Sequence, residues 1–116
     1  MKDKLKSIIA KKKCSEPDKI VSSFMRFLDR PIIVDFDFQE VSEFLDKGDE
    51  VKCFQKSELE KLKEFNPKAI FVLFLVEKGS FNLDEIDKTC NDLGIDDVSY
   101  VADIDNENKM EIIGIR

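Results

Sequence analysis

The segment Ala69-Ile-Phe-Val-Leu-Phe-Leu-Val76 is an uninterrupted apolar run, rich in β-branched and aromatic residues. Its length is typical of a β-strand, and the lack of any polar position predicts a strand that is buried on both faces. Such a strand lies inside a sheet, with other elements packed on each side. We therefore expect this segment to be the central strand of the fold.

Segments on both sides of this strand alternate between helical and extended patterns. Apolar residues recur at helical spacing behind N-cap and capping-box patterns, such as Asp37 with Glu40 and Ser57 with Glu60. The expected helices span residues 15–29, 37–47, 57–66 and 82–93, and the expected strands begin at Val51, Ala69, Val98 and Met110. The last two strands are predicted to form a terminal β-hairpin. The sequence thus predicts an α+β fold, a mixed four-stranded sheet with helices packed on it.

The 116 residues suffice for one compact domain, but their charge is uneven. Residues 1–30 hold nine Lys and Arg against four Asp and Glu, whereas residues 31–116 hold ten against twenty-one. We divide the chain into a basic N-terminal helical leader, residues 1–30, and an acidic α+β domain, residues 31–116. The acidic domain repels phosphate backbones, which disfavours nucleic-acid binding. Leu5, Ile8 and Ile9 of the leader are interpreted as contacts with the core, which disfavours membrane association.

The composition excludes several kinds of active site. The chain has no histidine, which rules out imidazole-based triads and histidine zinc sites. Its four glycines are scattered, so it has no glycine-rich phosphate-binding loop. The acidic segment from Asp103 to Asn108 lacks the pattern of a calcium loop and is interpreted as a solvated turn. We expect no independent enzyme activity, no cofactor and no metal site.

The three cysteines, Cys14, Cys53 and Cys90, lie on or near apolar faces without a CxxC pair. They are interpreted as packing residues rather than nucleophiles or ligands. An odd number of thiols without a signal-peptide pattern favours a reducing compartment, so we expect a cytoplasmic protein.

Two parts of the chain resemble the C-terminal domain of the FtsZ family of tubulin-like GTPases. Residues 20–45 are similar to the end of the core helix and the loop after it: this chain has Arg30-Pro31 and then Asp35-Phe-Asp-Phe-Gln-Glu-Val41, where the family has Arg-Pro-Gly-Leu and then Asn-Val-Asp-Phe-Ala-Asp-Val. Residues 70–114, including Phe81-Asn-Leu-Asp-Glu-Ile86, resemble the β-α-β-β part of that domain. The family's GTPase domain is absent, so the resemblance does not imply independent GTP binding.

The resemblance assigns roles to the loop that precedes the third expected helix. In the family this loop reaches across a filament interface, and its acidic residues help to hydrolyse the GTP of the neighbouring subunit. The matching positions are Asp35 for the family's Asn, Asp37 for its first Asp and Glu40 for its second. The resemblance therefore implies an interaction surface of Asp35, Asp37, Phe38 and Glu40, with Asp37 and Glu40 as accessory acids. The alternative is that Asp37 and Glu40 form an ordinary capping box.

Two functions follow as hypotheses. The first is a non-catalytic interaction module, similar to a stand-alone FtsZ C-terminal domain, that binds or caps the filament of a tubulin-like GTPase. The alternative is a small homo-oligomeric α+β protein with a metabolite-binding site at the subunit interface.

Overall fold

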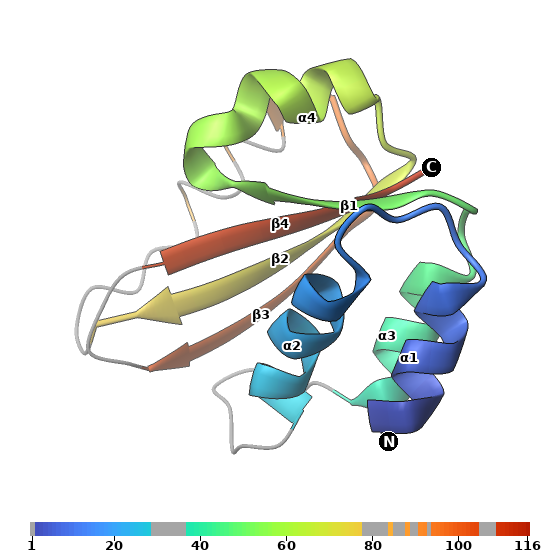
Figure 1. The fold of residues 1–116 in the computed structure, drawn as a ribbon. Coiled ribbons are helices and arrows are strands. Elements are labelled where there is room, and N and C mark those ends of the chain that lie inside the picture. Colours follow the sequence, from blue (N-terminus) through green and yellow to red (C-terminus); the bar gives the residue numbers. More distant parts are fainter. Residues whose placement is uncertain are drawn as a thin grey trace.

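The computed structural model describes residues 2–28, 37–77, 94–104 and 109–116, together with Asp84, Lys88, Asn91 and Asp92. Its helices are α1 (Lys2–Ala10), α2 (Pro17–Leu28), α3 (Phe38–Leu45) and α4 (Leu59–Phe65), and its strands are β1 (Val51–Gln55), β2 (Ala69–Val76), β3 (Val98–Ile104) and β4 (Lys109–Ile115). Figure 1 shows the sheet between α4 on one side and the three N-terminal helices on the other. The α+β class and the mixed four-stranded sheet are as the sequence predicts.

The strand order is β1-β4-β2-β3, and the predicted terminal β-hairpin is wrong. β4 pairs antiparallel with both β1 and β2, while β3 pairs parallel with β2. Val72 of β2 accordingly lies between Tyr100 of β3 and Ile112 of β4. The last residues of β4 are buried, as expected for a strand that lies between two others, here β1 and β2.

β2 is an inner strand, as its apolar sequence predicts. Phe71, Leu73 and Leu75 belong to the core on the side of α1–α3, and Ile70 and Val72 belong to the core on the side of α4. All five side chains are almost fully buried. Both faces of this strand are thus covered, in the manner expected of a continuous apolar run.

Phe71 joins the sheet to the helices. Its ring centroid is 5.5 Å from that of Phe24 in α2 and 5.5 Å from that of Phe44 in α3, with interplanar angles of 87° and 90°. These are edge-to-face contacts, a favoured arrangement for aromatic rings. Leu5 and Ile9 of α1 are buried in the same core, so α1 also packs on this side of the sheet. The predicted boundary after residue 30 lies outside the described residues.

The link between α1 and α2 pairs with the start of β1. The Lys13 N–H donates to the Asp49 carbonyl over 2.8 Å, and the Val51 N–H donates to the Lys13 carbonyl over 3.0 Å. These bonds occupy part of the outer edge of β1, which would otherwise present unpaired backbone groups.

α4 approaches the sheet closely because Gly114 of β4 lies beneath it. A Cβ atom at Gly114 would sit 3.4 Å from side-chain carbons of Leu62 and Phe65. The helix also starts differently from the prediction of a capping box at Ser57 and Glu60. β1 continues to Gln55, and a 3₁₀ turn at Lys56–Glu58 follows at once, with the Gln55 N–H donating to Glu58 Oε1 over 3.0 Å.

Other predictions have mixed outcomes. The strand expected from Val98 is β3, and Asp103, the first residue of the predicted solvated turn, belongs to it and is only 7% exposed; residues 105–108 of that turn lie outside the described residues. The predicted helix at residues 82–93 lies mostly outside the described residues, although Asp84, Lys88, Asn91 and Asp92 are helical. In the described part of the chain, no helix has the length and hydropathy needed to cross a bilayer.

Truncating Phe71 should destabilise the protein strongly. We expect Phe71→Ala to lower the free energy of unfolding by about 3–5 kcal/mol, because it removes a fully buried ring that two helices contact. Phe74→Ala, on the same strand but only half-buried, is the matched control and should cost less. Urea unfolding measures both. Equal losses for the two variants would contradict the central position of Phe71.

Candidate functional site

The start of α3 brings three of the four predicted interaction residues into one helical turn. Asp37 is the N-cap, with an extended backbone, and its Oδ1 accepts a hydrogen bond from the Glu40 N–H over 2.9 Å. Phe38 is half-buried and packs against the core, while Asp37 and Glu40 are exposed. Asp35 lies outside the described residues. The N-cap part of the alternative interpretation is therefore confirmed, and both carboxyl groups remain at the surface.

Carboxylates at this place favour the helix, because the N-terminal end of a helix carries partial positive charge. Exposed carboxylates can also orient a water molecule or meet a cation that another molecule supplies. Within the described ranges, no group of three Asp, Glu, Cys or His side chains is placed to hold a metal ion.

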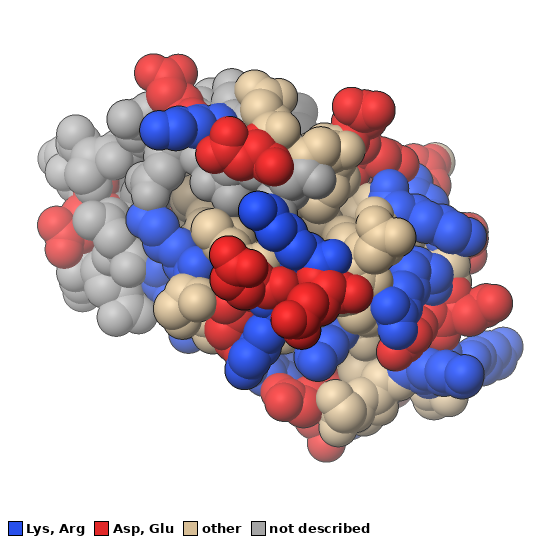
Figure 2. Space-filling model, turned by 90° about the horizontal axis from the view of Figure 1, so that it is seen from above, with Lys and Arg blue, Asp and Glu red and all other residues tan. Residues whose placement is uncertain are grey.

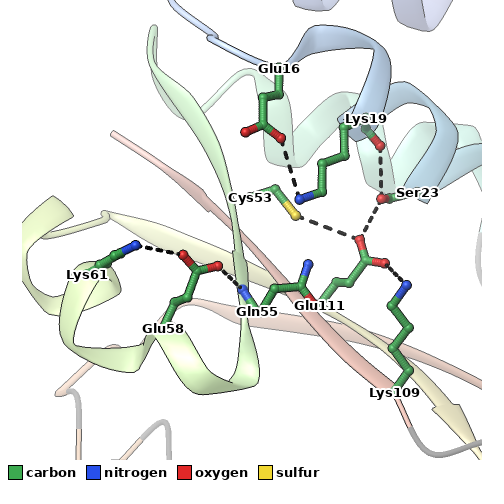
Figure 3. A network of polar contacts seen from close by, with 9 residues as sticks. All are labelled: Glu16, Lys19, Ser23, Cys53, Gln55, Glu58, Lys61, Lys109 and Glu111. Carbon is green, nitrogen blue, oxygen red and sulfur yellow. Dashed lines mark hydrogen bonds and ion pairs between the residues drawn. The ribbon is translucent and has the colours of Figure 1, made fainter.

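A second polar site, which the sequence did not predict, lies between α2, the end of β1 and the start of β4. Its centre is Glu111 of β4, whose side chain is 13% exposed. Ser23 Oγ of α2 donates to Glu111 Oε2 over 2.6 Å, and the Cys53 thiol of β1 lies 3.7 Å from the same oxygen. Lys109 Nζ lies 3.2 Å from Glu111 Oε1. Figure 3 shows these groups converging on the carboxylate from three elements.

The surroundings of Glu111 shift the acidity of two groups. Burial alone would raise the pKa of Glu111, but its hydrogen bonds with Ser23, Lys109 and Cys53 and the charge of Lys109 together hold that pKa below its ordinary value. Burial, and then the charge of Glu111, raise the pKa of the Cys53 thiol to about 12. Cys53 therefore stays protonated at neutral pH and packs like a small apolar residue, as the sequence predicts. Burial also raises the pKa of the Cys14 thiol.

Two adjoining hollows lie beside Glu111. The first, of about 240 Å³, is lined by Lys19, Ser22, Ser23, Arg26, Gln55, Lys109 and Glu111. The second, of about 410 Å³, is lined by Gln55, Lys56, Ser57, Lys109 and Met110. The two share Gln55 and Lys109 and are open to solvent, so we describe them together as the α2–β4 groove. Figure 2 shows that basic and acidic side chains lie interspersed on the face of the molecule seen from above.

One feature of the sequence does indicate Glu111. In a strand, alternate residues share a face, so Glu111 is in phase with Ile113 and Ile115. Those two isoleucines are buried against the N-terminal helices. A charged residue in phase with core residues needs polar partners, and Ser23 and Lys109 supply them.

Neutralising Glu111 should change how stability depends on pH. The pKa of Glu111 is lower in the folded protein than in the unfolded chain, so its carboxylate adds stability above the unfolded value and loses it as the pH falls through the folded value. We expect the free energy of unfolding of Glu111→Gln to fall less between about pH 7 and about pH 3 than that of the wild type. Glu64→Gln, at an exposed position in α4, is the control. Parallel curves for Glu111→Gln and wild type, measured by urea unfolding, would contradict this role.

Comparisons with known proteins support the fold alone. No protein-family model matches the sequence, and no curated protein matches it. A single-substitution mutant of FtsZ from M. jannaschii has a similar structure, with a TM-score of 0.52, 11% identity, and a match that covers 84% of this chain and 37% of that one. An empty FtsZ dimer from the same organism gives a TM-score of 0.49 and 10% identity, covering 84% of this chain and 36% of that one. The chain thus has an FtsZ-like fold and spans little more than a third of the length of the FtsZ chains that it resembles.

Proposed function

We propose that this chain is a non-catalytic interaction module, equivalent to a stand-alone FtsZ C-terminal domain. It binds a tubulin-like GTPase and caps the filament of that GTPase. The FtsZ-like fold supports this proposal, since 84% of the chain takes part in the structural match. The segments that resemble that domain in sequence hold most of α2, all of α3, and the strands β2, β3 and β4.

The observation that carries the proposal is the exposed acidic start of α3. In the sequence resemblance, Asp37 and Glu40 match the two acids of the family's interface loop, and in this structure both are exposed. Phe38, which packs on the core, fixes this turn relative to the sheet. Pre-organised carboxylates lose little conformational freedom on binding, which favours their use in an interface.

The chemistry of such an interface would be shared between two proteins. The partner supplies the nucleotide, because this sequence has no glycine-rich phosphate-binding loop. Asp37 and Glu40 would orient the attacking water at that nucleotide. A subunit that offers this surface without a nucleotide of its own ends a head-to-tail polymer, because such polymers need two complementary surfaces on every subunit.

The test uses the FtsZ-type GTPase from the organism that encodes this chain, polymerised with GTP. Adding the wild-type chain should lower the amount of polymer that sediments. The rate of phosphate release should then also differ from that of the GTPase alone. The double variant Asp37→Asn, Glu40→Gln should have neither effect. Asparagine is also a good N-cap residue, so we expect this variant to lose no more than about 1–2 kcal/mol of stability.

Glu43→Gln with Asp46→Asn is the matched control, because it removes two exposed acids at the other end of α3, one in its last turn and one at its C-cap. This control should behave like the wild type. If the wild-type chain leaves both polymer and turnover unchanged, the proposal is wrong, and the two acids serve only the start of α3.

A further inference from the structure

We propose that the α2–β4 groove binds an extended acidic segment of a partner protein. The charge of its lining points to this class of ligand. Among the residues that the structure describes, four basic side chains and one acid line the groove: Lys19, Arg26, Lys56, Lys109 and Glu111. The whole chain has the opposite balance, with 25 acidic and 19 basic residues. The groove is therefore a local basic surface on an acidic protein. Such a surface attracts the carboxylate groups of a ligand.

Glu111 does not cancel this attraction, because it is the least accessible charge in the groove. Its side chain is 13% exposed, compared with 42% for Lys109. Its oxygens are already held by Ser23 on one side and Lys109 on the other. This partly buried acid thus holds Lys109 where the two hollows adjoin, since Lys109 lines both of them.

The exposed ammonium groups can turn toward a ligand at small cost. Lys19 is 45% exposed and lies 3.5 Å from Glu16, which is itself 60% exposed. Ion pairs of this kind contribute about 0–1 kcal/mol, so exchanging Glu16 for a ligand carboxylate costs little. Lys109 has three N–H donors and can keep Glu111 while it donates to a second carboxylate.

The shape of the groove favours an extended chain over a compact metabolite. Sites for small molecules enclose most of the ligand surface. Here two hollows that are open to solvent adjoin each other and share Gln55 and Lys109 in their linings. Exposed hydroxyl groups at Ser22 and Ser57 provide further donors along the groove. In an extended segment, alternate side chains point to the same side, so acidic residues at every second position could face the lysines together.

The probe is a fluorescein-labelled peptide in which glutamate alternates with glycine, and the same peptide with glutamine in place of glutamate. Fluorescence anisotropy at low salt should show binding of the glutamate peptide to the wild-type chain and not of the glutamine peptide. Added salt should weaken this binding, because salt screens exposed charges. We expect Lys19→Gln with Lys56→Gln to weaken binding by about 10-fold or more, equivalent to about 1.4 kcal/mol.

Lys63→Gln with Lys68→Gln is the matched control, since it removes two exposed lysines that do not line the groove. It should bind the glutamate peptide like the wild type, and thermal unfolding should confirm that both double variants fold. Asp37→Asn with Glu40→Gln should also retain peptide binding, which separates this proposal from the proposed function.

Three outcomes would overturn the proposal. The first is a wild-type chain that does not bind the glutamate peptide at low salt. The second is an equal loss of binding in the groove variant and its control, which would mean unspecific attraction. The third is self-association in sedimentation equilibrium that Lys19→Gln with Lys56→Gln abolishes, because the occupant would then be a second copy of the chain.

Discussion

The edge-to-face packing of Phe71 between Phe24 and Phe44 is the contact on which the rest of the molecule depends. It fixes α2 and α3 on one face of the sheet, and both candidate surfaces follow from it. Ser23 precedes Phe24 in α2, so the helix position that buries the ring also brings the serine hydroxyl to Glu111. α3 buries Phe44 near its end and presents Asp37 and Glu40 at its start. Positioning by a packed core is what makes such surface groups usable for recognition.

Local signals in the sequence predicted local structure well. The apolar run of β2 and the N-cap at Asp37 are confirmed, because each depends on residues close together in the chain. Strand pairing depends on distant residues, and the expected hairpin is wrong since β2 separates β3 from β4. The predicted site could be located through a loop of consecutive residues around Asp37. The α2–β4 groove could not be located from the sequence, because Lys19 and Lys109 are far apart in the chain and only the fold brings them into the lining of one hollow.

The two surfaces have opposite charge and different demands on a partner. The acidic turn at Asp37 and Glu40 suits a partner that supplies a nucleotide, whereas the basic groove suits acidic side chains in an extended chain. The FtsZ-like fold is compatible with either, because a fold does not determine the sites it carries. Both surfaces, however, require that α2 and α3 stay fixed to the sheet in the free protein. That requirement is the central structural claim, since loosely attached helices α2 and α3 could position neither Ser23 nor Asp37.

Native-state hydrogen exchange tests this claim most directly. If the contacts of Phe71 join the helices and the sheet into one cooperative unit, the slowest backbone amides of α2, such as that of Phe24, should exchange with the same free energy as those of β2. Both should equal the free energy of global unfolding, and both should respond equally to added denaturant. Exchange of the α2 amides at a free energy several kcal/mol lower, with β2 still protected, would show that the helices detach from the sheet and would contradict the account.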